Sequence, residues 1–257
     1  MRTTVVTGAA SGIGAATAAL LRDRGERVIG VDLHDAEVEV DLGSPDGRAE
    51  LVSAVARLSG GVVDAVIAVA GTAALVPANV AVNYFGMIAT LDGVRPLLAG
   101  AAHPRAVATA SLAVNFPNDK RLVDAMLRDD EPAALSRATE LLASPATQTQ
   151  LYISSKHALA RWIRRAAPTD RWAGAGIPLN AIAPGVVRTP MAPDVDTEDG
   201  RARLLAQVPM PLNGVEDPVV PGRLLAWLAG EENTHLCGQI VFVDGGADAI
   251  ARGDLAW

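Results

Sequence analysis

The chain is predicted to fold as a single α/β domain around a doubly wound, mostly parallel sheet. Short β-branched runs alternate along it with longer stretches rich in Ala, Leu and Arg. Most of these short runs are continuously apolar, as parallel strands covered by helices on both faces require. A glycine-rich segment lies between the first run and the first helical stretch. Repeated strand-then-helix order of this kind is typical of the Rossmann-type fold.

Six strands are expected, and most of them are short, continuously apolar runs. They cover residues 3–6, 27–31, 65–69, 106–109, 179–182 and 239–243. Residues 13–24 instead carry apolar side chains at helical spacing, and Gly25 follows as a stop signal. No internal repeat or linker interrupts the pattern before the last strand. Residues 1–257 are therefore expected to form one domain.

One long segment, residues 115–150, departs from the regular alternation. Its apolar residues, mixed with acids and arginines, are Leu122, Val123, Met126, Leu127, Leu135, Leu141 and Leu142. This pattern predicts a helical insertion of two amphipathic helices, broken near Glu131 and Pro132. The insertion is either a surface elaboration or part of the wall of a binding site, and the sequence favours neither.

Composition argues against several classes of protein. Half of the residues are hydrophobic, and the formal net charge is −7 with no basic block, so a nucleic-acid partner is not expected. No stretch approaches the ~18 to 20 apolar residues of a membrane span, and the N-terminal apolar run leads into a glycine turn unlike a signal peptide. Cys237 is the only cysteine, which excludes an intramolecular disulfide and a cysteine-based zinc site. A cytoplasmic, metal-free protein is expected.

Residues 7–14, Thr-Gly-Ala-Ala-Ser-Gly-Ile-Gly, have the position of a phosphate-binding loop between a strand and a helix. Glycines let a pyrophosphate approach bare backbone at a helix N-terminus, where free N–H groups and the helix dipole attract an anion. An ordinary turn is the alternative in a chain with 24 glycines, but the strand-to-helix context favours phosphate binding. The candidate contacts are Gly8, Ser11, Gly12, Ile13 and Gly14.

Asp32, at the end of the second expected strand, indicates which dinucleotide binds. It follows Gly14 at the distance where an acid accepts hydrogen bonds from the adenosine ribose. A 2′-phosphate there would meet like charge, at a cost of roughly 4 kcal/mol for 4 Å and an effective dielectric of 20. Ser11 brings no basic side chain to receive that phosphate, so NAD is favoured over NADP, unless Asp32 is a solvated loop acid. Asp41 and Leu42 are weaker candidates beside the adenine, since Asp41 can also cap a helix.

Tyr152, Lys156 and Ser111 are the candidate catalytic groups. The first two are four residues apart, so on a helix continuing to Arg165 both project from one face. A nearby ammonium favours the phenolate and is expected to lower the pKa of Tyr152 from about 10, making it a general acid for ketone reduction and a base for alcohol oxidation. Such a pair alone is common, but the glycine loop in the same chain favours catalysis. Ser111 follows an expected strand, where ligands of open α/β sheets bind, and is placed to hold the substrate oxygen.

These motifs together resemble the short-chain dehydrogenase/reductase family over essentially the whole chain. Residues 7–14 resemble its cofactor loop, and the serine, tyrosine and lysine match three members of its catalytic tetrad. Residues 82–86 resemble the helix segment that carries the fourth member. The resemblance implies that Asn83 holds a water in a proton relay and that the lysine also contacts the nicotinamide ribose.

The resemblance also implies cofactor contacts outside the glycine loop. Residues 180–190 resemble the loop that orients the nicotinamide, with the Val187 backbone and the Thr189 hydroxyl on its carboxamide, and residues 244–246 resemble the family's closing turn. Residues 68–71 read Ala-Val-Ala-Gly where the family has Asn-x-Ala-Gly, which removes a structural hydrogen bond. The implied contacts are Ala70, Gly71, Tyr152, Lys156, Pro184, Gly185, Val187 and Thr189.

Within the family, the chain resembles the bacterial 3α-hydroxysteroid dehydrogenase/carbonyl reductases. The likeness rests on residues 32–38, on residues 82–86 and on the spacing of 41 positions from Ser111 to Tyr152, whereas residues 112–116 differ. It implies an NAD(H)-dependent oxidoreductase for a secondary alcohol and its ketone, with 3-hydroxysteroids as first candidates and coniferyl-type alcohols as the alternative. A non-catalytic NAD-binding regulator would be expected to lack the tyrosine or the lysine, and an epimerase of the extended relatives would carry a further C-terminal region.

The expected substrate pocket is apolar, with candidate walls at Leu112, Val114, Phe116, Met191 and Met210. It would bind by burying apolar area, at roughly 25 cal/mol per Å², which favours a bulky apolar alcohol or ketone; otherwise these residues only complete the core. The insertion is expected to add apolar surface near the pocket mouth. It precedes a helix through which family members usually pair, so a homodimer is expected more readily than a tetramer.

Overall fold

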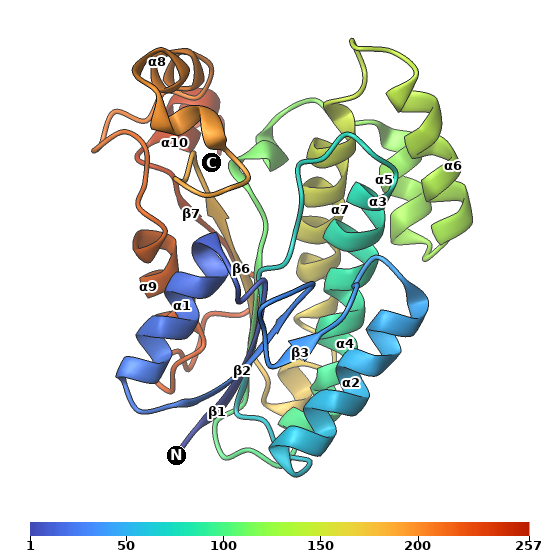
Figure 1. The fold of residues 1–257 in the computed structure, drawn as a ribbon, viewed down its shortest axis with the longest axis vertical. Coiled ribbons are helices and arrows are strands. Elements are labelled where there is room, and N and C mark those ends of the chain that lie inside the picture. The colour runs from blue at the N-terminus through green and yellow to red at the C-terminus, as the bar shows by residue number, and fades with distance from the viewer. Residues whose placement is uncertain (257) are drawn as a thin grey trace.

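Seven strands form one parallel sheet in the order β3-β2-β1-β4-β5-β6-β7 in the computed structural model, which describes residues 1–256 (Figure 1). The strands are β1 (Thr3–Thr7), β2 (Arg27–Asp32), β3 (Val38–Glu39), β4 (Ala65–Ala68), β5 (Arg105–Thr109), β6 (Leu179–Pro184) and β7 (Ile240–Val243). The strand order reverses between β1 and β4, so the sheet is doubly wound, as predicted. That reversal leaves a crevice at the carboxyl ends of the strands.

Helices cover both faces of the sheet. They are α1 (Gly12–Asp23), α2 (Pro45–Ser59), α3 (Ala78–Val80), α4 (Met87–Leu98), α5 (Lys120–Leu127), α6 (Glu131–Leu142), α7 (Gln150–Ala166), α8 (Glu198–Gln207), α9 (Val219–Leu228) and α10 (Ala247–Arg252). Two shorter elements are the π-helical turn η1 (Ala81–Gly86) and the 3₁₀ turn η2 (Leu112–Asn115). Figure 1 shows α1 and α9 on one face, α2, α4 and α7 on the other, and α5 and α6 outside α7. Within residues 1–256, no helix is long and apolar enough to span a membrane.

Successive residues of the central strands face the two helical layers in turn. Val6 of β1 and Ile67 of β4 pack in the core under α1 and α9, whereas Val5 and Val66 pack in the core under α2, α4 and α7. All four side chains are fully buried. Burial on both faces is therefore the reason that the strands appear in the sequence as continuous apolar runs.

The observed elements differ from the expected ones mainly at their ends. The six expected strands begin or end within two residues of the observed bounds, and the expected helix 13–24 is α1. The sequence does not predict β3, which pairs with β2 only through Val38 and Glu39. Two residues are too few to give a periodic signal.

The segment 115–150 forms two helices, as expected, but the break between them lies slightly earlier than predicted. Asp129 has the left-handed backbone conformation, with φ of 60°, and follows the end of α5. Glu131 and Pro132 open α6, and the Asp130 carboxylate accepts a hydrogen bond from the Ala133 N–H at 3.0 Å. Proline is well tolerated in a first helical turn, so it marks the start of α6 and not a break.

Candidate active site

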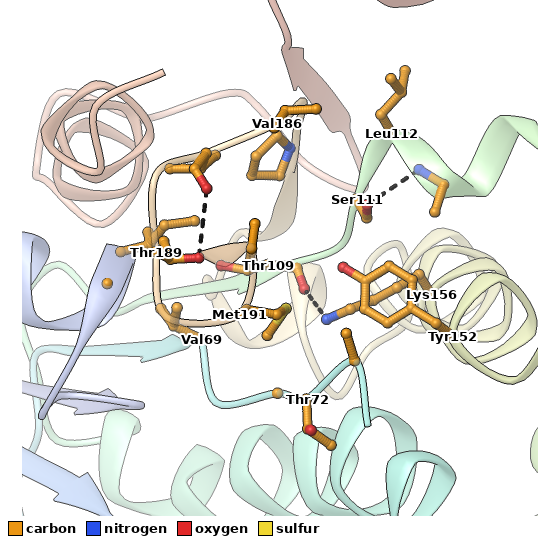
Figure 2. A pocket seen from close by; sticks show the side chains of 18 of the residues that line it. Val69, Thr72, Thr109, Ser111, Leu112, Tyr152, Lys156, Val186, Thr189 and Met191 are labelled. Carbon is orange, nitrogen blue, oxygen red and sulfur yellow. Dashed lines mark hydrogen bonds between the residues drawn. The ribbon is translucent and has the colours of Figure 1, made fainter. Parts of the chain in front are cut away.

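A cavity of about 820 Å³ opens at the carboxyl ends of β1, β4, β5 and β6 (Figure 2). Its size lies within the ~300 to 1,000 Å³ of ligand sites, and its position is the crevice that the strand order creates. Most of the residues predicted to bind cofactor or substrate line it. They are Gly8, Ser11, Gly12, Ile13, Gly14, Ala70, Gly71, Ser111, Leu112, Phe116, Tyr152, Lys156, Pro184, Gly185, Val187, Thr189 and Met191.

The glycine loop gives the cavity a wall of bare backbone. A Cβ at Gly14 would overlap the carbonyl oxygen of Gly8, and Gly12 combines φ of +50° with a Cβ position 2.9 Å from the Thr189 side chain. The first turn of α1 has no acidic residue, and the Ser11 hydroxyl makes no capping hydrogen bond. The first amides of α1 are therefore free to receive an anion.

Thr109, at the end of β5, presents an unsatisfied polar atom at the cavity. Its Oγ1 is buried and has no hydrogen-bond partner within residues 1–256, and the residue lines the cavity. A buried hydroxyl without a partner costs about 1–3 kcal/mol, a cost that a bound polar group removes. The bare glycine wall, the open helix N-terminus and this hydroxyl together fit a dinucleotide cofactor.

Tyr152, Lys156 and Ser111 converge beside this wall (Figure 2). The first two lie one turn apart on α7, and the Lys156 Nζ donates to the Thr109 carbonyl at 2.9 Å. The ammonium nitrogen lies 5.7 Å from the centroid of the Tyr152 ring. Ser111 begins η2, where its Oγ accepts the Ala113 N–H at 3.1 Å.

Burial is the main influence on the pKa values of Tyr152 and Lys156, the two α7 residues of the site. Burial raises the pKa of the Tyr152 phenol, and its hydrogen bond with Ser111 lowers that pKa by less. The lowering expected from the sequence is thus wrong in direction, because desolvation of the phenolate outweighs its stabilisation. Burial also lowers the pKa of Lys156 to about 8. At neutral pH the tyrosine is therefore a proton donor beside a charged lysine.

Asn83, in η1, does not line the cavity. Its side chain is instead hydrogen-bonded to the backbone of Thr72, a residue of the cavity wall. Its Oδ1 accepts the Thr72 N–H at 2.8 Å, and its Nδ2 donates to the Thr72 carbonyl at 2.8 Å. The same Nδ2 lies 3.0 Å from Asn79 Oδ1 and 3.3 Å from Ser155 Oγ. The side-chain amide is thus engaged by protein groups, and the water relay stays a prediction.

Three residues expected near the adenosine lie outside the cavity. The carboxylate of Asp32 accepts hydrogen bonds from the Ala10 N–H at 2.9 Å and the Leu33 N–H at 2.7 Å, which places it against the glycine loop. Asp41 is exposed and accepts the Gly43 N–H at 2.8 Å, in the turn before α2. Leu42 is buried. Asp32 keeps a position suited to a ribose, whereas Asp41 and Leu42 form the turn.

Two residues expected in the substrate pocket do not line it. The η2 turn directs Leu112 to the cavity and Val114 to the opposite side, where its carbonyl lies 3.2 Å from His157 Nδ1. Met210 is buried below the loop that follows β6, and its sulfur accepts the Val186 N–H at 3.2 Å. Val114 and Met210 differ from the expectation for the same reason. The sequence predicts which segment lies at the site, but not which of its side chains face the cavity.

Other lining residues were missed by sequence reasoning. They are Val69, Thr72, Ala73, Ala74, Thr109, Ala110, Ala113, Val186, Pro190, Ala192, Leu204 and Val208. The segment after β4 could have been found, since it leaves the carboxyl end of a central strand. No residue of 117–150 lines the cavity, so apart from Phe116 the insertion does not supply the apolar surface expected at its mouth.

The titration of Lys156 can be observed directly, because the chain has only two lysines, Lys120 and Lys156. We expect one lysine side-chain resonance to titrate with a pKa of about 8, because burial lowers the pKa of Lys156. NMR of protein carrying isotope-labelled lysine measures this, with the exposed Lys120 as internal comparator and Lys156→Met for assignment. A Lys156 resonance that keeps the chemical shift of the charged form well above pH 8 would contradict the expectation.

Comparisons with known proteins agree with this geometry. A family model described as enoyl-(acyl carrier protein) reductase matches residues 133–248. The 3-alpha-hydroxysteroid dehydrogenase/carbonyl reductase of Comamonas testosteroni is 33% identical over 96% of this chain and 97% of its own. The cis-4-hydroxycyclohexanecarboxylate dehydrogenase of Sinomonas cyclohexanicum is 31% identical over 97% of both chains. The crystal structure of the 3-alpha-hydroxysteroid dehydrogenase from Pseudomonas sp. B-0831, complexed with NADH, is similar with a TM-score of 0.89, 36% identity and 98% coverage of both chains. The chain belongs to the short-chain dehydrogenase/reductase family.

Proposed function

We propose that this protein is an NAD(H)-dependent oxidoreductase that interconverts a bulky, apolar secondary alcohol and its ketone. The observation that carries the proposal is the convergence of Ser111, Tyr152 and Lys156 beside the glycine-walled cavity. The relatives named for hydroxysteroid and hydroxycyclohexanecarboxylate substrates, and the similar structure that holds NADH, support the same reaction class of a cyclic secondary alcohol and its ketone.

Each catalytic side chain has a role that its surroundings permit. A nicotinamide cofactor bound along the glycine wall would supply the hydride chemistry, with the hydride leaving the alcohol carbon in oxidation and reaching the ketone carbon in reduction. The Ser111 hydroxyl holds the substrate oxygen, and Tyr152 gives that oxygen a proton in reduction or takes one in oxidation. Because burial raises the pKa of Tyr152, the phenol is protonated when reduction begins. Tyr152 becomes a phenolate once it has given its proton. Lys156, hydrogen-bonded to the Thr109 carbonyl, stabilises this phenolate with a nearby positive charge.

Replacing the proton donor tests this mechanism. We expect Tyr152→Phe to reduce kcat by about 10²- to 10⁴-fold, the usual contribution of a general acid or base, with NADH affinity largely retained. Tyr84→Phe is the matched control, because Tyr84 is the other tyrosine, is buried and does not line the cavity. Steady-state kinetics and NADH binding measure the two effects. Near-native turnover in Tyr152→Phe would rule the mechanism out.

NAD is the proposed cofactor because Asp32 places a carboxylate beside the glycine loop, close to where a 2′-phosphate would lie. We expect the wild type to favour NAD strongly in kcat/KM, and Asp32→Ala to reduce the NAD/NADP ratio by removing like-charge repulsion. Asp32→Ala also removes the hydrogen bond from the Ala10 N–H. A loss of efficiency from that change affects both cofactors alike and cancels in the ratio. Asp23→Ala, at the exposed end of α1, is the control. Equal efficiency of the wild type with both cofactors would contradict this choice.

The substrate class follows from the chemistry of the cavity wall. Lys156 is the only charged side chain among its lining residues within 1–256, and the Thr109 carbonyl engages it. Phe116, Met191 and Val208 offer apolar surface, and Phe116 and Met191 are partly exposed at 37% and 45%. Covering such side chains gains roughly 25 cal/mol per Å² of apolar area. A fused-ring alcohol fits this wall better than a charged or polyhydroxylated one.

A substrate panel tests that choice. We expect kcat/KM with NAD to fall in the order androsterone, cyclohexanol, sorbitol, because the apolar area available for burial falls in that order. Coniferyl alcohol represents the alternative aryl-allyl class. Met191→Ser should lower kcat/KM for androsterone more than for cyclohexanol. The highest efficiency with sorbitol would refute the apolar-pocket argument, and the highest with coniferyl alcohol would favour the alternative.

Assembly as a homodimer is also proposed. Family members usually pair through the helices represented here by α4 and α7, and α5 and α6 both pack against α7. These helices therefore cover part of one usual contact surface, which favours pairing through a single remaining surface. Light scattering is expected to give the mass of two chains, and a clean tetramer mass would contradict the proposal.

A further inference from the structure

Glu216 pairs with the loop that follows β6 and, unlike Gly185 and Val187 of that loop, does not line the cavity. Its N–H donates to the Val186 carbonyl at 2.9 Å, and its carbonyl accepts the Arg188 N–H at 2.9 Å. These two bonds form a parallel bridge between Glu216 and Val187. The backbone of Glu216 thus supports the loop that lines the cavity.

The side chain of Glu216 turns back against the same loop. The residue is only 8% exposed, and its Oε1 accepts the Gly185 N–H at 3.3 Å. Its Oε2 is buried and has no hydrogen-bond partner among residues 1–256. The Gly185 N–H also donates to the Val243 carbonyl at 3.0 Å, so the carboxyl meets the loop at the point where the loop is joined to the end of β7.

The surroundings of the carboxyl hold no compensating cation within the described chain. Asp244, also buried, is the charged group that acts on it, and the Asp244 oxygens accept the Gly246 and Asp248 N–H groups. Arg188 pairs with Asp196 at the surface. Met210 brings only a thioether to the same loop.

Together, these contacts bring the pKa of the Glu216 carboxyl close to neutral pH. Burial and the neighbouring Asp244 raise the pKa of Glu216, and the Gly185 N–H lowers it, with a net value of about 7. Ionisation near neutral pH therefore puts an unpaired charge next to Asp244 in a site with little water. Such a charge is relieved by moving the carboxylate towards solvent, and that movement breaks its contact with Gly185.

We propose that Glu216 is a positioning residue for the nicotinamide end of the cofactor site: its neutral carboxyl stays against Gly185, beside the backbone bridge to Val187, and its ionised carboxyl leaves that position and loosens the loop. This inference rests on the proposed NAD(H)-dependent function. A cofactor bound against the loop excludes water from it and so favours the neutral carboxyl further. By linkage, the ligand then binds most tightly below pH 7, and affinity falls as the pH rises through the titration of Glu216.

The test is NADH binding, followed by fluorescence, between pH 6 and 8.5. If binding raises the pKa of Glu216 by one unit, the wild type loses up to about tenfold in affinity across this range. Glu216→Gln keeps the size and neutral hydrogen bonding of the side chain but cannot ionise. We expect this variant to lose less affinity between pH 6 and pH 8.5 than the wild type loses. Glu232→Gln, at an exposed site, should retain the wild-type profile.

Lys156 also titrates in this range, and the variants separate its effect from that of Glu216. Any dependence due to Lys156 remains in Glu216→Gln, whereas the part due to Glu216 disappears. A pH profile of Glu216→Gln that equals the wild-type profile would overturn the inference. No NADH binding by the wild type at any pH would instead overturn the proposed function.

A second measurement does not depend on any variant. Hydrogen exchange of the Gly185 and Arg188 amides in the wild type, corrected for intrinsic rates, should be faster at pH 8.5 than at pH 6, because both amides are hydrogen-bonded at this loop. The Val66 amide, in the central strand β4, is the internal reference. A catalytic readout adds a distinction, because a positioning role raises the KM for NADH at high pH with a smaller change in kcat. Corrected exchange that is equal at both pH values would contradict the release of the loop.

Discussion

The hydrogen bond from the buried ammonium of Lys156 to the carbonyl of Thr109 connects the covering helix α7 to the end of β5. Lys156 is only 3% exposed, so its charge has lost most of its contact with water and depends on this acceptor. The bond fixes the height of α7 along the sheet, and with it Tyr152, one turn earlier. Ser111 lies two residues beyond Thr109, so one contact sets the distance between proton donor and substrate-holding hydroxyl. The dry environment that this arrangement requires also lowers the pKa of the lysine.

The sequence predicted which segments meet, because a parallel sheet collects the carboxyl ends of its strands along one edge. The glycine loop after β1, Ser111 after β5 and the Thr189 loop after β6 therefore line a common cavity. It did not predict which way individual side chains point within a segment. Leu112 and Val114 belong to the same short turn and face opposite sides of it. Periodicity is defined over several turns of a regular element, and a four-residue turn offers no such average.

Properties that depend on burial were the least accessible from sequence. The spacing of Tyr152 and Lys156 suggests attraction between an ammonium and a phenolate, but the cost of desolvating the phenolate is larger and reverses the direction of the pKa shift. Glu216 carries no sequence signal, since a lone glutamate outside any recognised motif is usually a solvated acid. Only the tertiary structure places it under Gly185 and beside Asp244. Charged groups far apart in sequence shift each other's pKa only once the fold brings them together and removes the water between them.

The strand order also governs when the site can form during synthesis. On the side of β1 away from β2, the sheet grows outward in chain order through β4, β5, β6 and β7. A nascent chain that has just completed α7 already contains Ser111, Tyr152 and Lys156, but its sheet ends at β5 with an unpaired edge. The support of the β6 loop comes from Glu216 and Val243, which are made last. The complete cofactor site thus forms late in folding, and the edge of β5 stays unpaired until β6 has been made.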